Sequence, residues 1–121
     1  MLVRYKKSFE KLAMGLLSFM PEEKEVKRLM ETMQKYEHDD HWQLYLWKKD
    51  EEFVGLVGVF TQDKVATIQH ITVMPSYRGE GIAMAMLLEL SKQYEKLLAC
   101  EATESFINKC LPIINGADGT I

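Results

Sequence analysis

The chain has 121 residues, of which 47% are apolar and 27% charged, and its net charge at neutral pH is −3. This composition is typical of one globular domain, and the negative charge argues against general binding to nucleic acid or to an anionic membrane surface. Apolar runs stay below the roughly 18 residues that a membrane span needs, and Met1–Tyr5 lacks the hydrophobic region of a signal peptide. Two cysteines are too few for a disulfide framework. We therefore predict a single domain over residues 1–121 and a cytoplasmic location.

The first third of the chain predicts a short strand, Met1–Lys7, followed by two amphipathic helices. Apolar residues recur at helical spacing in two stretches: Phe9, Leu12, Ala13, Leu16, Leu17 and Met20, then Val26, Leu29, Met30, Met33 and Tyr36. Ser8 is a candidate N-cap of the first helix, and Pro21 ends that helix or begins the next. The outer face of the second helix is expected to carry the ion pairs Glu23–Lys27 and Glu31–Lys35.

The middle of the chain predicts an antiparallel meander of strands. Trp42–Trp47 and Phe53–Phe60 alternate and are rich in aromatic and β-branched residues, and short polar turns follow each of them. Gly55 and Gly58 interrupt the second strand, which indicates a bulge or a close approach by other atoms.

The stretch from Ile68 to Leu88 is the most informative. Ile68–Met74 reads as a strand, Pro75 takes the chain out of the sheet, and Arg78-Gly79-Glu80-Gly81 makes a tight turn. Strong helix formers follow from Ile82. A strand that turns through glycines onto a helix N-terminus presents unpaired amides to an anion.

The glycine turn matches neither common nucleotide-binding fingerprint. Met84 stands where the third glycine of G-x-G-x-x-G belongs, and no G-K-[ST] ending is present. Arg78-Gly79-Glu80-Gly81-Ile82-Ala83 follows the pattern R/Q-x-x-G-x-G/A behind a strand that ends in Val-x-Pro. It resembles the pyrophosphate loop of the GNAT acyltransferase superfamily. A purely structural strand-to-helix turn is the alternative interpretation.

The resemblance implies an α/β GNAT fold with a mixed central sheet, in which an antiparallel meander leads to a splayed parallel strand pair, all flanked by helices. It implies acetyl-CoA or CoA as co-substrate, no metal, and an amine acceptor that is a small molecule or a peptide. The implied cofactor-binding residues are Ile71, Thr72, Val73, Arg78, Gly79, Glu80, Gly81, Ile82, Ala83 and Met84. Of these, the backbone N–H of Ile71 would polarise the thioester carbonyl. The loop His38–His41 would border the acceptor site, although a solvated polar loop is the default for it, and adjacent residues cannot all face one metal ion.

In the resembled fold, the acyl-pantetheine arm enters the gap between the two splayed parallel strands. Residues expected near this gap are the candidates for catalysis. Leu97–Ala102 is predicted as the strand parallel to Ile68–Met74, because a crossover helix joins them. Glu101 on this strand is the carboxylate expected beside the gap and is the candidate general base. If Ile71 and Val73 face the acceptor, alternation puts Thr67 and Gln69 on their face and makes Gln69 a second candidate. His70 is a further candidate base, because its pKa suits proton transfer, but alternation turns it and Thr72 the other way. We therefore expect His70 to be packed or hydrogen-bonded at a helix.

The C-terminal part departs from the family pattern. Glu104–Ile114 predicts a short last helix that Pro112 ends, and residues 115–121 are rich in turn formers. Complete members carry further strands, and they commonly carry a tyrosine on this helix that protonates the leaving thiolate, but this chain has no tyrosine after Tyr94.

The sequence therefore predicts an acyl-CoA-dependent N-acyltransferase that moves an acyl group directly to an amine. One alternative is a catalytically weak or inactive CoA-binding regulatory protein. Another is an interaction module that pairs through a free sheet edge with a second copy as a homodimer.

Overall fold

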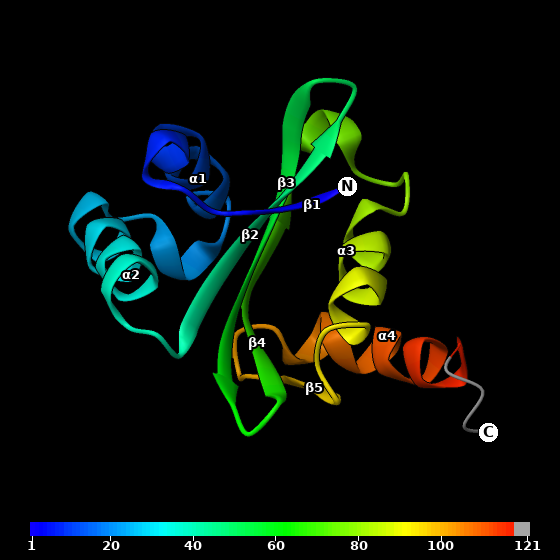
Figure 1. Ribbon diagram of the computed structural model, residues 1–121. Coiled ribbons are helices and arrows are strands. Elements are labelled where there is room, and N and C mark those ends of the chain that lie inside the picture. The colour runs from blue at the N-terminus through cyan, green and yellow to red at the C-terminus, as the bar shows by residue number, and fades with distance from the viewer. Residues whose placement is uncertain (118–121) are drawn as a thin grey trace.

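The computed structural model describes residues 1–117, without the side chains of residues 111, 113 and 115–117. A five-stranded sheet of order β1-β2-β3-β4-β5 carries α1 and α2 on one face and α3 and α4 on the other (Figure 1). The elements are β1 Leu2–Arg4, η1 Lys7–Phe9, α1 Glu10–Leu17, η2 Pro21–Glu23, α2 Val26–His38, β2 Trp42–Lys49, β3 Glu52–Gln62, β4 Val65–Val73, η3 Pro75–Tyr77, α3 Ile82–Ser91, β5 Lys96–Ala99 and α4 Glu104–Ala117. Strands β1 to β4 are antiparallel and β5 is parallel to β4, so the predicted α/β fold and mixed sheet are confirmed.

Helices α1 and α2 cover one face of the sheet. Only some of the apolar residues that were predicted at helical spacing are buried there. The shared core on this face contains Ala13, Leu16, Leu17, Leu29, Met33, Tyr36, Leu44, Leu46 and Leu56. Val26 and Met30, by contrast, are 68% and 55% exposed. The predicted cap is wrong, because Ser8 lies inside η1 and α1 begins after Phe9 without a side-chain cap.

Glu23 was expected on the outer face of the second helix, and this expectation is wrong. Pro21 begins the separate 3-10 turn η2, and α2 starts only at Val26. Glu23 therefore lies outside the helix, and its position does not follow helical spacing. Its side chain turns inward and is 2% exposed.

Helices α3 and α4 cover the opposite face. The buried side of α3 consists of Ile82, Met86, Leu87 and Leu90. Pro112 was expected to end α4, but the helix continues to Ala117. Ile107 and Cys110 before the proline and Ile114 after it are all buried in one core, so packing on both sides of Pro112 offsets the hydrogen bond it cannot donate. The expected turn at residues 115–117 is therefore helix, and residues 118–121 lie outside the described chain.

Strand β4 changes the facing of its side chains at Gln69. The register with β3 passes from Val59↔Ile68 to Gly58↔His70, so Gln69 is the extra residue of a β-bulge. As a result Ile68 and Ile71 both pack toward the α3–α4 core, while His70 faces α2. Alternation had put Thr67 on the same face as Ile71, and this is wrong because the bulge lies between the two residues. The prediction that His70 packs at a helix is confirmed.

The parallel pairing of β4 with β5 is short. It runs from Val65↔Lys96 to Ile68↔Ala99, and β5 ends there instead of reaching Ala102 as predicted. The second half of β4, Gln69 to Val73, therefore has β3 on one side and no strand on the other within the described chain. Among the described residues 1–117, no helix is both long and apolar enough to cross a lipid bilayer.

Candidate functional site

The turn between β4 and α3 uses its glycines as the sequence predicts. Gly79 and Gly81 have φ of 83° and 81°, values that glycine adopts without steric cost, and Gly81 is the N-cap of α3. The first intrahelical bond runs from the Ala85 N–H to the Gly81 carbonyl at 3.0 Å. The amides of Ile82, Ala83 and Met84 precede it and point out of the helix end. The first turn of α3 carries no acidic side chain, so this end of the helix suits an anion.

Arg78 is held at the edge of this turn. Its Nε donates to the Val73 carbonyl at 2.9 Å, and its guanidinium lies 5.6 Å from the centre of the Phe19 ring. The side chain is exposed, and its two terminal nitrogens are not used in the Val73 hydrogen bond. Arg78 can therefore donate a forked pair of hydrogen bonds to an anion on the turn.

A cavity of about 490 Å³, here called the turn cavity, opens beside the turn. It is lined by Met20, Ile71, Thr72, Val73, Tyr77, Arg78, Gly79, Gly81, Ile82, Ala83, Met84, Ala102, Thr103, Phe106 and Cys110. Every cofactor-binding residue expected from the sequence is on its wall except Glu80, whose exposed carboxylate pairs with Lys49 Nζ.

Thr103 marks the point where β4 and β5 separate. Its hydroxyl donates to the Ile68 carbonyl at 2.7 Å and accepts from the Cys100 N–H at 3.1 Å. These bonds take the place of the next step of the parallel ladder. Beyond them β4 continues to Val73, whereas the chain after β5 turns into α4. We call this point the fork. Because Thr103 also lines the turn cavity, the cavity reaches the fork.

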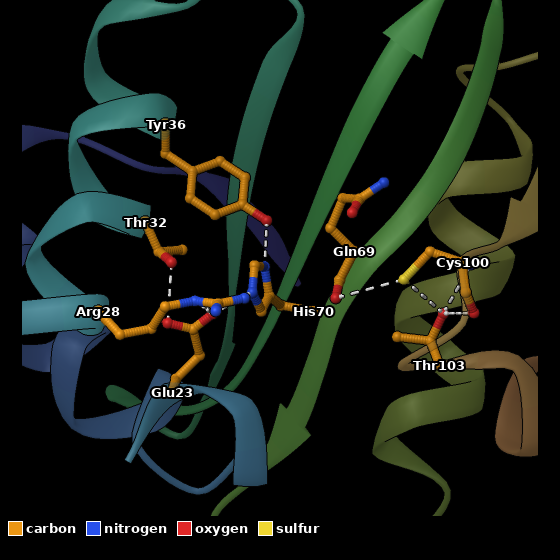
Figure 2. A network of polar contacts seen from close by, with 8 residues as sticks. All are labelled: Glu23, Arg28, Thr32, Tyr36, Gln69, His70, Cys100 and Thr103. Atoms are coloured by element: carbon orange, nitrogen blue, oxygen red, sulfur yellow. Dashed lines mark hydrogen bonds and ion pairs between the residues drawn. The ribbon is translucent and has the colours of Figure 1, made fainter. Parts of the chain in front are cut away.

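A buried polar cluster lies on the other face of β4 (Figure 2). His70 Nε2 is 3.0 Å from Glu23 Oε1, and His70 Nδ1 is 2.6 Å from the Tyr36 hydroxyl. Thr32 Oγ1 donates to Glu23 Oε2 at 2.8 Å, and Arg28 Nε lies 3.8 Å from Glu23 Oε1. Because Glu23 Oε1 accepts a hydrogen bond from Nε2, His70 donates from Nε2 and accepts the hydrogen bond of the Tyr36 hydroxyl at Nδ1. The cluster ties η2 and α2 to the central strand.

Burial shifts the pKa values of two members of this cluster, His70 and Tyr36. It lowers the pKa of His70, although the hydrogen bond and charge of Glu23 act in the opposite direction. Burial, with the charge of Glu23, raises the pKa of Tyr36 well above its ordinary value. At neutral pH both side chains are therefore uncharged.

The cluster borders a second cavity of about 150 Å³, here called the His70 cavity. It is lined by Glu22, Glu23, Arg28, Thr32, Lys35, Trp42, Gln69, His70, Cys100 and Ala102. Ala102 lines the turn cavity as well, so the two cavities come together at the fork.

The two catalytic candidates from the sequence lie in different surroundings. Gln69 lines the His70 cavity, and its carbonyl is 3.9 Å from Cys100 Sγ. Glu101 is exposed in the turn after β5 and lines neither the turn cavity nor the His70 cavity.

Sequence reasoning missed Glu23, Tyr36 and Thr103 as polar parts of the site. Pro21 was a signal for Glu23, because a proline that separates two helices also removes the helical spacing that put Glu23 outside. Local sequence holds no corresponding signal for the Tyr36 hydroxyl, whose partner His70 is 34 residues away.

The loop His38–His41 lines neither the turn cavity nor the His70 cavity. Its Asp39 and Asp40 line a third cavity of about 480 Å³ together with residues of β1 and β2, and His41 Nδ1 donates to the Thr61 carbonyl at 2.8 Å. Among the described residues, no three His, Cys, Asp or Glu side chains are grouped so that they could hold a metal ion. Cys100 and Cys110 are free thiols.

Comparisons with known proteins agree with this arrangement. The family model of the acetyltransferase (GNAT) family matches residues 10–108. A relative from Bacillus methanolicus, named as an uncharacterized N-acetyltransferase in the lysA 3' region, is 49% identical over 113 residues. That match covers 91% of this chain and 94% of the relative.

Solved structures show the same fold at low sequence identity. AAC(6')-Iy, in complex with the bisubstrate analog CoA-S-monomethyl-acetylneamine, superposes with a TM-score of 0.73 at 14% identity, covering 92% of this chain and 85% of that one. A ribosomal-protein-alanine N-acetyltransferase from Brucella melitensis has a TM-score of 0.68 at 19% identity, covering 83% and 78%. The family model and the relative from Bacillus methanolicus together identify the chain as an enzyme of the acetyltransferase (GNAT) family, a GNAT-type N-acetyltransferase.

Proposed function

We propose that the protein binds acetyl-CoA, or another acyl-CoA, in the turn cavity and transfers the acyl group directly to an amine. The observation that carries the proposal is the continuity of one cavity from the glycine turn to the fork of β4 and β5. A pyrophosphate and a pantetheine arm are joined in CoA in the same order. AAC(6')-Iy, which has this fold, has been solved with CoA.

The turn is proposed to hold the pyrophosphate. The amides of Gly79, Glu80, Gly81, Ile82, Ala83 and Met84 surround the N-terminus of α3, where the helix dipole adds partial positive charge. Arg78 supplies the full positive charge. Since the chain as a whole carries a net charge of −3, these local donors have to supply the attraction for a polyanionic ligand.

The pantetheine arm is proposed to lie along the second half of β4. Ile71, Thr72 and Val73 line the turn cavity where β4 has lost its parallel neighbour. Backbone groups on an open strand edge need hydrogen-bond partners, and the amides of pantetheine supply them as a short added strand would. The Ile71 N–H is the proposed donor to the thioester carbonyl.

The leaving thiolate is proposed to depart without a tyrosine acid. Cys110 lines the turn cavity, but burial raises the pKa of its thiol, which makes it a poor proton donor. Free thiols ionise at about pH 8.5, so a CoA thiolate is a fair leaving group near neutral pH. Departure of the thiolate without a general acid is proposed to cost about 10²-fold in rate.

The acceptor is proposed to be an amine of a small molecule or a peptide. The chain as a whole, and its opening M-L-V-R-Y-K-K-S-F-E-K-L in particular, resembles RibT, the GNAT-like protein of bacterial riboflavin operons. We propose this as the subgroup within the family, and it leaves the acceptor open. Two free thiols support a reducing, cytoplasmic location. A homodimer through the sheet edge at β1 or β5 also stays a proposal.

Calorimetry with CoA and acetyl-CoA tests the proposed function. We expect micromolar binding to the purified protein, and release of free CoA thiol from acetyl-CoA that depends on added amine. If CoA thiol is released at the same rate without any amine, the protein binds and hydrolyses acetyl-CoA but does not transfer the acyl group. Failure to bind CoA at millimolar concentration would overturn the function altogether.

A further inference from the structure

We propose that the His70 cavity receives the primary ammonium group of the acyl acceptor and that the Glu23 carboxylate accepts its proton. The proposal rests on the acyltransferase function proposed above and assigns it an acceptor site and a general base. Neither Glu101 nor the loop His38–His41 is needed for it.

The His70 cavity lies directly beside the turn cavity along β4. Consecutive residues of β4 line the two cavities: Gln69 and His70 line the His70 cavity, and Ile71, Thr72 and Val73 line the turn cavity. Ala102 closes both from the other side of the fork. An acyl group carried along β4 to the fork therefore ends at the border of the His70 cavity, where an amine held in that cavity can attack it.

Glu23 has hydrogen-bonding capacity that its protein partners do not use. A carboxylate has about four lone-pair sites, and Glu23 uses two of them for His70 and Thr32. The side chain is 2% exposed but lines a cavity, so an entering ammonium can reach its remaining sites without competing bulk water. His70 lacks such capacity, because Glu23 and the Tyr36 hydroxyl occupy both ring nitrogens. His70 is therefore a positioning residue that holds the carboxylate.

The size and charge of the His70 cavity restrict the acceptor. A volume of about 150 Å³ has room for a terminal aminoalkyl group. Arg28 and Lys35 lie on the wall beside Glu22 and Glu23, so the rest of the acceptor meets positive as well as negative charge. We infer an unbranched primary amine whose remaining part is not polycationic.

The reaction balances without any further reactant. The ammonium gives one proton to the Glu23 carboxylate and becomes a neutral amine. The nitrogen lone pair then forms the C–N bond to the acyl carbon, and the electron pair of the C–S bond leaves on sulfur. The nitrogen loses its second proton, the CoA thiolate takes up one proton, and Glu23 returns its proton to water. The sum is an amide, CoA thiol and one released proton.

The test uses ethylamine as the probe and follows kcat/KM for thiol release from acetyl-CoA between about pH 7 and pH 9. The groups facing Glu23 are Glu22 on η2, Arg28, Lys35 and Tyr36 on α2, His70 on β4, and Cys100 after β5. If Glu23 takes the proton, the wild type uses the ammonium form, and its kcat/KM is flat over this range. The Glu23→Gln variant reacts only with the small fraction of the amine that is already neutral. Its kcat/KM is therefore low and rises about tenfold per pH unit below the amine pKa of about 10.4.

Matched variants separate this role from a structural one. Glu25→Gln removes a nearby exposed carboxylate outside the cavity and is expected to keep the flat wild-type profile. His70→Gln is expected to lower kcat and keep the flat profile, as a positioning residue should. If Glu23→Gln fails to fold, Glu23→Asp keeps the carboxylate and is expected to give a flat profile at lower kcat. Glu101→Gln tests the rival carboxylate, and a tenfold-per-unit slope in that variant alone would overturn the proposal.

Binding of ethylamine provides a readout that needs no turnover. Titration into the CoA-bound protein is expected to give saturable NMR shifts of the His70 ring that are lost in Glu23→Gln and kept in Glu25→Gln. Equal shifts in both variants, or no shifts and no amine-dependent thiol release, overturn the acceptor site. Calorimetry of CoA binding by the same variants distinguishes this failure from failure of the proposed function, because Glu23 does not line the turn cavity.

Discussion

The hydroxyl of Tyr36 occupies the space that a side chain on Gly58 would need, so that an ideal Cβ at Gly58 would overlap the phenol oxygen. Gly58 lies on β3 opposite His70, and the same hydroxyl is hydrogen-bonded to the His70 ring. The glycine that interrupts β3 therefore makes room for the polar cluster beneath α2.

Gly58→Ala is expected to destabilise the protein by about 2–4 kcal/mol, because it overpacks the site and displaces the Tyr36 hydroxyl from His70. Urea denaturation measures the change. Gly15→Ala is the matched control, since a Cβ at this exposed position of α1 meets nothing within 4 Å. It is expected to stabilise the helix by about 0.5–1 kcal/mol. An equally small effect at Gly58 would contradict the packing described here.

His70 is expected to titrate below its ordinary pKa of 6.5 because burial disfavours the imidazolium. The unfolded chain then binds more protons than the folded one as the pH falls below 6.5. The free energy of unfolding should therefore be highest above this pH and decrease toward lower pH, by at most about 1.4 kcal/mol per unit for this one group. NMR of the imidazole resonances gives the pKa directly, and denaturation of His70→Gln at several pH values should lack this component. A His70 midpoint above 6.5 would show that the charge of Glu23 outweighs burial.

Gly81→Asp is expected to abolish CoA binding, because it places a negative charge at the N-terminus of α3, where the pyrophosphate is proposed to lie. Gly81→Asn is the matched control, since asparagine has nearly the same shape, tolerates positive φ and is neutral. Calorimetry should therefore find CoA binding that is weakened in Gly81→Asn and lost in Gly81→Asp. The same CoA affinity in Gly81→Asn and Gly81→Asp would show that the pyrophosphate does not bind at this turn.

Arg78→Ala is expected to weaken acetyl-CoA binding by about 1.5–3 kcal/mol, the usual range for hydrogen bonds to charged groups. Pantetheine lacks the pyrophosphate, so its affinity should change little. Arg78 also donates to the Val73 carbonyl, and a loss of the same size for pantetheine would mean that the residue acts by shaping the turn.

Local sequence was sufficient wherever the deciding interactions are local. Pro75, the glycines at 79 and 81 and the helix formers from Ile82 predicted strand, turn and helix, because each residue restricts its own backbone. The parallel pairing of β5 followed from the single crossover helix, which allows one arrangement of the two strands. The residues proposed to bind the cofactor were implied by the resemblance of this one continuous stretch to the pyrophosphate loop of the family, and they line one cavity in the structure.

Only the tertiary structure decided the cluster of Glu23 and His70, where the acceptor is proposed to bind. Glu23 is buried because His70, 47 residues later, supplies its partner, and the bulge at Gln69 turns His70 toward it. The continuation of α4 through Pro112 likewise depends on a core built from distant strands. Backbone restriction acts between neighbours and can be seen in the sequence, whereas burial of a charge is favourable only when a distant partner compensates its lost hydration.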